Sequence, residues 1–186
     1  PQEKFLELVH RLDKETSGLI LIAKKRKALV DIHRQIRGKL LHKKYQVIVN
    51  GMWEKKQLTV NLDLLKMTTH DGQKKVKVVT ANNQKETSKD SRSVFFLQDC
   101  YKFFSLLDVK LITGRTHQIR VHLSYLGFPI VGDEKYGDFK LNKIHNKIGF
   151  KRMYLHAGEL GFIHPISGEK HFIKAPIPDE FNDLLT

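Results

Sequence analysis

The stretch HRLDKETSGLILIA at residues 10–23 joins a charged segment to an apolar run. The run at residues 18–23 is typical of a strand that is buried on both faces of a sheet. Asp13 would then stand just before a rigid element, where a carboxylate can act as a nucleophile or a general base. An aspartate in such a place also commonly forms a turn, here with the help of Thr16 and Ser17. Taken alone, this stretch favours the turn over the catalytic role.

The sequence that follows predicts a series of regular elements. Apolar residues recur every three or four positions from about Lys25 and predict a helix that ends near Gly38, with Leu40 as the last residue of its apolar stripe. The other predicted elements are strands at residues 45–50, 93–97, 106–112, 155–163 and 170–174, and a helix at residues 116–126.

The middle of the chain, residues 52–89, is polar, and residues 76–79 carry its strongest strand signal. Residues 138–151, which are rich in lysine and asparagine, predict a loop or a short helix. Many short strands with few helices and no regular strand–helix alternation favour an α+β fold, with a mixed, largely antiparallel sheet flanked by a few helices. Since there is no repeat and no long flexible linker, residues 1–186 are predicted to form one domain.

The composition and charge restrict the class of protein and its partners. The chain has 186 residues and carries 33 Lys+Arg against 20 Asp+Glu, which is a formal net charge of +13. Such an excess favours nucleic acid as a partner, with an anionic membrane surface or a merely basic surface as alternatives. No apolar run approaches the roughly 20 residues that span a bilayer, and no helix pairs a basic face with a broad aromatic one, so no membrane is expected. The single cysteine, Cys100, excludes an internal disulfide framework and a cysteine-rich zinc site, and fits a cytoplasmic location.

A second polar cluster, GRTHQIRVH at residues 114–122, lies where the second helix is expected to begin. Guanidinium groups at Arg115 and Arg120 beside a helix N-terminus can bind an anion, or either can fix a carboxylate by a bidentate pair. His117 and His122 are five residues apart, which does not bring two ligands to one helical face. With no glutamate beside them, no metal site is predicted, and both histidines are interpreted as hydrogen-bonded structural residues.

Tyr45 follows the basic pair Lys43 and Lys44 at the start of a predicted strand. A tyrosine next to cations suits stacking on a nucleobase, although a tyrosine on a sheet face is the commoner case. The chain has no phosphate-binding Gly-Lys-Ser/Thr loop and no dinucleotide-binding glycine pattern, so no nucleotide or redox cofactor is predicted.

Several of these stretches together resemble the signatures of the RluA-type pseudouridine synthases. The resemblance rests first on HRLDKETSGL at residues 10–19 and on residues 114–122. The other matching residues are Lys44-Tyr45, Gly127-Phe128-Pro129-Ile130, Gly132-Asp133, Tyr136-Gly137, Leu155-His156-Ala157, His164-Pro165 and Ala175-Pro176. The resemblance spans nearly the whole chain, and the residues around the first signature are most similar to members that act on large-subunit ribosomal RNA. It implies the pseudouridine synthase fold and the conversion of selected uridines to pseudouridine without a metal or a cofactor.

The resemblance also implies roles for individual residues. Asp13 would be the catalytic aspartate, Arg120 its ion-pair partner, and Tyr45 the ring that packs against the target base. A base that is stacked in a helix cannot turn, so the uridine must first be flipped out into a pocket. The residues expected to contact the RNA are Arg11, which fills the vacated place in the stack, Leu155, which lines the base pocket, and Arg115.

The resemblance further implies that the domain is N-terminally incomplete, because the family's S4-like RNA-binding module and the first strands of its catalytic domain have no counterpart in these residues. We expect a cytoplasmic monomer whose partner is large-subunit ribosomal RNA. A non-catalytic RNA-binding module on the same scaffold is the main alternative, and the presence of Asp13, Arg120 and Tyr45 favours the enzyme over it. A protein that binds double-stranded DNA is a further alternative, for which the sequence lacks a recognition-helix pattern.

Overall fold

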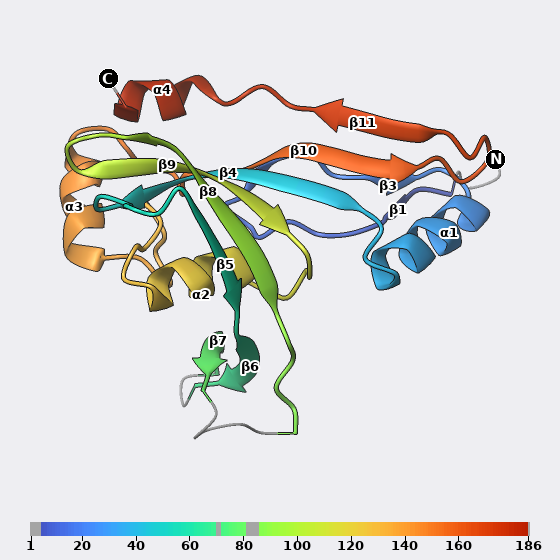
Figure 1. Ribbon diagram of the computed structural model, residues 1–186, viewed down its shortest axis with the longest axis horizontal. Helices are drawn as coiled ribbons and strands as arrows, with labels where there is room; N and C mark the ends of the chain where they lie inside the picture. Colours follow the sequence, from blue (N-terminus) through green and yellow to red (C-terminus); the bar gives the residue numbers. More distant parts are fainter. Residues whose placement is uncertain (1–4, 70–71, 81–85, 186) are drawn as a thin grey trace.

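A seven-stranded sheet forms the centre of the structure, a computed structural model that describes residues 5–69, 72–80 and 86–185. Its strands are β2 (Ser17–Gly18), β4 (His42–Asn50), β5 (Gln57–Asn61), β8 (Arg92–Cys100), β9 (Phe104–Leu111), β10 (Leu155–Ile163) and β11 (Lys170–Lys174). Six of them follow the order β11–β10–β4–β9–β8–β5, and β2 joins beside β10 (Figure 1). All neighbours pair antiparallel except β2 with β10. The predicted α+β fold with a mixed, largely antiparallel sheet is therefore confirmed.

Four helices and two small sheets complete the part of the chain that the structure describes. They are α1 (Arg26–Arg37), α2 (Gln118–Tyr125), α3 (Phe139–Lys147) and α4 (Asp179–Leu185), with β1 (Glu7–Leu8) paired to β3 (Ile22–Ala23), and β6 (Asp63–Thr68) paired to β7 (Lys74–Val79). Strands β10 and β11 have the predicted bounds, and α3 is the short helix that was one of two alternatives for its segment. Strands β5 and β6 and helix α4 were not predicted. Within the described residues, no helix is long and apolar enough to cross a membrane.

The apolar run at residues 18–23 is not one strand buried on both faces, and that prediction is wrong. The run is divided between β2, which pairs with β10, and β3, which pairs with β1. Ile20 and Ile22 are exposed. The reason lies at Gly18, whose φ is +110° and whose missing Cβ would stand 2.3 Å from the Ala157 carbonyl oxygen. The chain passes close to β10 at this glycine and then leaves the central sheet.

Side chains on the two faces of β4 explain the positions of two helices. Val47 and Val49 pack with Ile119 and Leu123 of α2 on one face. Ile48 lies on the other face, in a cluster that includes residues of α4. This alternation is the ordinary consequence of strand geometry, in which successive side chains point to opposite faces. Helix α2 is thereby held against the strand that carries Tyr45.

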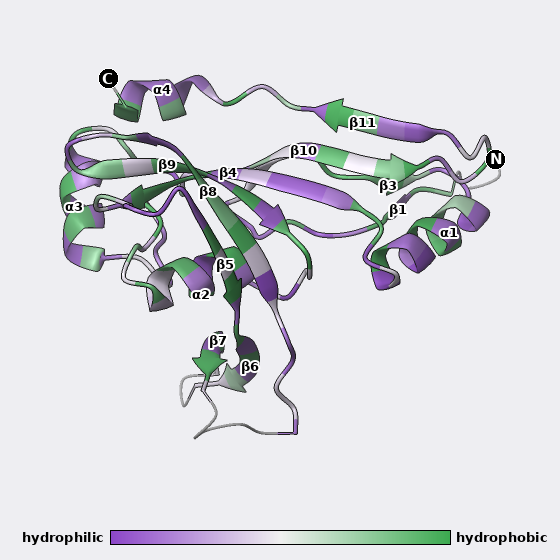
Figure 2. Ribbon diagram, in the orientation of Figure 1, coloured by the Kyte–Doolittle hydropathy of each residue, from purple (hydrophilic) through white to green (hydrophobic). Residues whose placement is uncertain are grey.

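Helix α1 packs its apolar stripe toward β10, where Ile32 and Leu160 are buried in one cluster. Polar and apolar residues alternate along α1 in Figure 2, as expected for a helix with one solvent-facing side. The helix ends at Gly38, as predicted, and the chain then turns through Lys39, whose φ is +57°. Leu40 lies beyond this turn and is exposed, so its predicted place on the helical stripe is wrong.

The hairpin of β6 and β7 projects away from the central sheet (Figure 1) and contacts the rest of the molecule near α2. Leu64 and Val76 of the hairpin pack with Val121 of α2 in a small apolar cluster. The backbone N–H of Val76 also donates a hydrogen bond to Tyr136 Oη at 3.0 Å. The hairpin is thus anchored beside α2 and the loop that precedes α3.

Candidate active site

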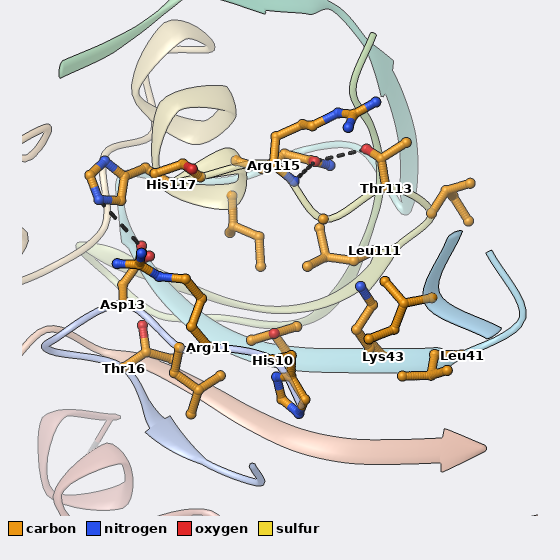
Figure 3. Close-up of a pocket in the computed structure, with 18 of the residues that line it drawn as sticks. His10, Arg11, Asp13, Thr16, Leu41, Lys43, Leu111, Thr113, Arg115 and His117 are labelled. Carbon is orange, nitrogen blue, oxygen red and sulfur yellow. Dashed lines mark hydrogen bonds and ion pairs between the residues drawn. The ribbon is translucent and has the colours of Figure 1, made fainter. Parts of the chain in front are cut away.

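A cavity of about 650 Å³ lies between the segment before β2, strand β4 and the start of α2. All six residues that the sequence analysis assigned to the site line it: Arg11, Asp13, Tyr45, Arg115, Arg120 and Leu155. Figure 3 shows several of these side chains around the cavity, together with others such as Lys43 of β4 and Leu111 of β9. The fold therefore brings residues from opposite ends of the chain to one place.

The backbone around Asp13 holds its side chain at the wall of this cavity. The Thr16 N–H donates to the Asp13 carbonyl oxygen at 2.9 Å, which closes a turn, and the pairing of β2 with β10 follows at once. The Asp13 side chain is 17% exposed. Asp13 therefore forms the turn that the sequence favoured, while its carboxylate remains open to the cavity.

Arg120, on α2, links Asp13 to a second carboxylate. Its Nη1 donates to Asp13 Oδ2 at 3.2 Å. Its Nε and Nη2 donate to Oδ2 and Oδ1 of Asp133, both at 2.8 Å. The bidentate partner of Arg120 is thus Asp133, a residue to which the sequence analysis gave no role. Because Asp133 fixes the plane of the guanidinium, the remaining Nη1 edge is presented to Asp13.

Asp133 is fully buried and is well supplied with hydrogen bonds. Its Oδ1 accepts the backbone N–H groups of Lys135 at 2.8 Å and Tyr136 at 3.0 Å. Burial works to raise the pKa of Asp133, but the hydrogen bonds and charge of Arg120 outweigh it and hold the pKa below its ordinary value. Burial likewise works to lower the pKa of Arg120, and the two carboxylates raise it instead. The pair is therefore ionised at neutral pH.

His117 and Tyr136 extend this network toward the β6–β7 hairpin. His117 directly precedes α2 in a left-handed conformation, with φ at +54°. Its Nδ1 lies 2.8 Å from Tyr136 Oη, and its Nε2 lies 3.9 Å from Asp13 Oδ1. The Tyr136 ring also lies under the Arg120 guanidinium, with 5.1 Å from Cζ to the ring centroid. Burial lowers the pKa of His117, although the charge of Asp13 opposes this, so the ring is neutral at pH 7.

The interpretation of His117 as a structural residue misses its position in the cavity. It is hydrogen-bonded, as predicted, but it also faces the Asp13 carboxylate. The sequence does hold a signal for this, because His117 and Arg120 are three residues apart and so share one side of the helix start.

Tyr45 and Leu155 form an apolar part of the cavity wall. Tyr45 packs against the same cluster as Val47, and Leu155 pairs with Val47 across β4 and β10. Burial, with a smaller effect of the charge on Asp13, raises the pKa of Tyr45 to about 12. The phenol therefore keeps its proton at neutral pH.

The two arginines at the rim differ in what they contact. Arg11 is exposed and has no ion-pair partner among the described residues. Arg115 Nε donates to the carbonyl oxygen of Asp90 at 2.9 Å, and Nη2 donates to Asp90 Oδ1 at 3.2 Å. Arg115 therefore contacts a carboxylate, but not by a bidentate pair, because only one of its two bonds reaches the Asp90 carboxylate.

His122 is a structural histidine, as predicted. It is fully buried, and its two ring nitrogens lie 2.7 Å from Ser91 Oγ and 3.1 Å from Ser93 Oγ. In the described residues, no group of three or more histidine, cysteine, aspartate or glutamate side chains could hold a metal ion. Burial lowers the pKa of His122 from 6.5 to about 4.

This shift predicts a measurable acid sensitivity of the fold. Between pH 6.5 and about 4 the unfolded chain binds a proton at residue 122 that the folded chain does not. The free energy of unfolding should therefore fall by about 3 kcal/mol from this group as the pH falls through that interval. For the variant His122→Gln, urea denaturation at several pH values should give a slope of unfolding free energy against pH that is smaller, between pH 6.5 and about 4, by the equivalent of about one proton. Equal pH dependences of the unfolding free energy in the variant and the wild type would contradict the lowered pKa of His122.

Comparison with known proteins agrees with this fold. Residues 1–125 match the family described as RNA pseudouridylate synthase. Ribosomal large subunit pseudouridine synthase C of Pasteurella multocida (strain Pm70) is 41% identical over 185 residues, which cover 100% of this chain and 55% of that protein. The protein of the same name from Escherichia coli (strain K12) is 41% identical over 187 residues, which cover 100% of this chain and 57% of that protein. The chain thus spans about half the length of these curated relatives.

Two solved structures share the fold. Human RNA Pseudouridylate Synthase Domain Containing 1 has a TM-score of 0.77 and 26% identity, covering 92% of this chain and 69% of that one. Human RNA Pseudouridylate Synthase Domain Containing 4 has a TM-score of 0.75 and 25% identity, covering 95% of this chain and 73% of that one. The resemblance inferred from the sequence motifs is confirmed, and the chain belongs to the RNA pseudouridylate synthase family.

Proposed function

We propose that this protein converts uridines of large-subunit ribosomal RNA to pseudouridine, with Asp13 as the catalytic carboxylate and the target base flipped out into the cavity. The names of its relatives support the reaction and the class of RNA. The observation that carries the proposal is the Asp13 carboxylate, which opens to a cavity and is held by a guanidinium that Asp133 fixes in turn.

The reaction is an isomerisation, and its requirements fit this cavity. The N1–C1′ bond of the uridine breaks and a C5–C1′ bond forms, while C5 loses a proton and N1 gains one, so no co-reactant is consumed. A stacked base cannot turn, and flipping it out costs a few kcal/mol. The volume of about 650 Å³ is within the range of about 300–1,000 Å³ that is usual for sites of small ligands, so a nucleoside fits.

Three routes are open to the carboxylate. It can attack C1′ of the ribose, attack C6 of the uracil ring, or remove the C2′ proton to give a glycal. Each route uses a carboxylate oxygen of Asp13, and the Arg120 guanidinium, whose Nη1 donates to Asp13 Oδ2 at 3.2 Å, holds that carboxylate in place.

The remaining cavity residues take roles around the base. Tyr45 and Leu155 offer an apolar wall against which a uracil can pack. Arg11, exposed at the rim and without an ion pair among the described residues, is suited to enter the stack that the base leaves. Arg115 uses two of its donors on Asp90, which leaves fewer for the RNA, so we expect its contribution to be the smallest of these.

The raised pKa of Tyr45 allows a test of whether Tyr45 interacts electrostatically with the Asp13 carboxylate. Because the negative charge of Asp13 disfavours a phenolate, the variant Asp13→Asn should lower the pKa of Tyr45 from about 12. Burial, the larger cause, should still keep it above the ordinary 10.0. An NMR titration of the tyrosine ring carbons measures both values, and an unchanged pKa would mean that the two groups do not interact.

The proposed reaction is tested by the proton that it releases. Large-subunit ribosomal RNA labelled with tritium at C5 of uridine is incubated with the complete gene product. Tritium should pass into water in proportion to the pseudouridine found after digestion of the RNA. Binding of the RNA without release of tritium would favour the non-catalytic RNA-binding module instead. Equal affinity for RNA and double-stranded DNA at one salt concentration would favour the DNA-binding alternative.

A further inference from the structure

Two neighbouring lysines of β4 have opposite surroundings. Lys44 Nζ lies 2.7 Å from Asp108 Oδ2 and 3.8 Å from Glu159 Oε1, so its charge is paired on one face of the sheet. Lys43 points to the other face and lines the cavity with Tyr45, as strand alternation requires (Figure 3). Among the residues that the structure describes, no carboxylate forms an ion pair with Lys43.

The groups near Lys43 supply no negative charge. Its Nζ lies only 2.9 Å from the point where a side chain at Gly114 would begin, so the ammonium is packed against bare backbone. The nearby ring of His10 is neutral, since its Nε2 accepts the Leu21 N–H at 3.1 Å, and burial lowers its pKa. Of the described residues, Asp13 is the one carboxylate that lines the cavity, and the other charged side chains in its lining are cations: Arg11, Arg37, Lys39, Arg115 and Arg120.

A cation in this position is costly for the free protein. Burial lowers the pKa of Lys43, which means that the fold disfavours its charge. Lys43 is half-buried, and an ammonium that is partly removed from water is normally paired. The chain provides such a pair for Lys44 but not for Lys43. The missing anion must therefore come from a ligand if the charge is to be compensated.

The position of Lys43 along β4 indicates which part of a ligand it meets. Lys43 and Tyr45 are two residues apart on one face, which separates their side chains by about 7 Å. If a flipped uracil packs on Tyr45, Lys43 lies one step further along the strand, beside the RNA chain that carries the base. Resting on the proposed function, we infer that Lys43 binds a phosphodiester group of the RNA adjoining the target uridine, by a charge-assisted hydrogen bond.

The test pairs a change in the protein with a change in the RNA. The shortest ribosomal RNA fragment that the protein binds is prepared with a neutral methylphosphonate at each linkage in turn. For the wild type, one linkage should lower the affinity about 10-fold when it is neutralised. For Lys43→Met, which keeps the apolar stem, all-phosphate RNA should bind about 10-fold more weakly, and neutralising that same linkage should have no further effect. The plot of log affinity against log salt should also become shallower by about 0.7, the value of one single-stranded phosphate.

Three controls separate this role from others. Lys143→Gln removes an exposed charge on α3, outside the cavity, and should leave the linkage pattern and the salt dependence unchanged. Lys43→Arg keeps the charge, so neutralising the identified linkage should again lower the affinity, as it does for the wild type. Because an unpaired, half-buried charge is removed, Lys43→Met should melt at the same or a higher temperature than the wild type, whereas a merely structural lysine would give a lower one.

The inference is overturned if no linkage couples to Lys43. The readout is binding, so it does not require turnover. Coupling without tritium release would reject the proposed reaction and retain the phosphate contact, and release without coupling would do the reverse.

Discussion

Replacement of Asp13 by asparagine is expected to lower the rate of pseudouridine formation by about 10⁴-fold or more, the usual effect of removing a group that reacts in the rate-limiting steps. Asparagine has nearly the size of aspartate but cannot attack a carbon centre as an anion or accept a proton at neutral pH. The rate is measured as tritium release from C5-labelled ribosomal RNA under single-turnover conditions, so that product release does not limit it.

The fold and the affinity for RNA should survive this change. In Asp13→Asn the Arg120 guanidinium keeps both of its 2.8 Å hydrogen bonds to Asp133, so no buried charge loses its partner. Removing a negative charge from a site for a polyanion should leave the affinity unchanged or make it slightly tighter. A variant that folds, binds RNA and keeps a rate within tenfold of the wild type would reject Asp13 as the catalytic residue.

Periodic apolar residues made much of the sheet predictable. Strands β4, β9, β10 and β11 were found because apolar residues alternate in them or run between turn signals. Strands β5 and β6 were missed because their segment is polar, and β6 is stabilised by pairing with β7 and by contact with Val121, far away in the sequence. The strand prediction for residues 18–23 was wrong for the opposite reason, because that segment is apolar. Its hydrophobicity resembles that of a buried strand, but a close approach of Gly18 to β10 diverts the chain.

Some features of the site could likewise be predicted from local sequence, whereas others depend on the tertiary fold. The motifs around Asp13 and Arg120 are contiguous, so their residues could be named from the sequence, and the structure brings them to within 3.2 Å. The contact of Arg120 with Asp133 depends on how the loop after α2 folds back, and no spacing rule for side chains specifies that. Lys43 illustrates a further limit. Its neighbour Lys44 is identical in type, and only the pairing of strands reveals which of the two lacks a carboxylate.

Replacement of Asp133 by asparagine is expected to act mainly on the fold. The change leaves the Arg120 guanidinium, which is 8% exposed, without its bidentate partner. Removing one member of a buried pair costs about 3–5 kcal/mol of unfolding free energy, because the other charge stays buried. For a domain of this size that corresponds to a fall in Tm of about 6–20 °C, which calorimetry measures. Pseudouridine formation should fall as well, since the guanidinium is no longer held toward Asp13.

The pH dependence of stability adds an independent test of the Asp133 pair. The pKa of Asp133 is lowered in the folded protein, so its stabilising effect is present above the ordinary value of 3.8 and is lost as the pH falls through the folded value. Asp133→Asn should therefore lose stability at neutral pH and differ less from the wild type in acid. A double-mutant cycle with Arg120→Met completes the argument. Asp133→Asn leaves Arg120 with only its 3.2 Å contact to Asp13, and Arg120→Met leaves the buried Asp133 carboxylate unpaired. The double variant contains neither member of the Asp133–Arg120 pair, so the two losses should fall short of additivity by about 1–3 kcal/mol. Additive losses would mean that Asp133 and Arg120 stabilise the fold independently, and that Asp13 does not depend on Asp133 for the position of its guanidinium.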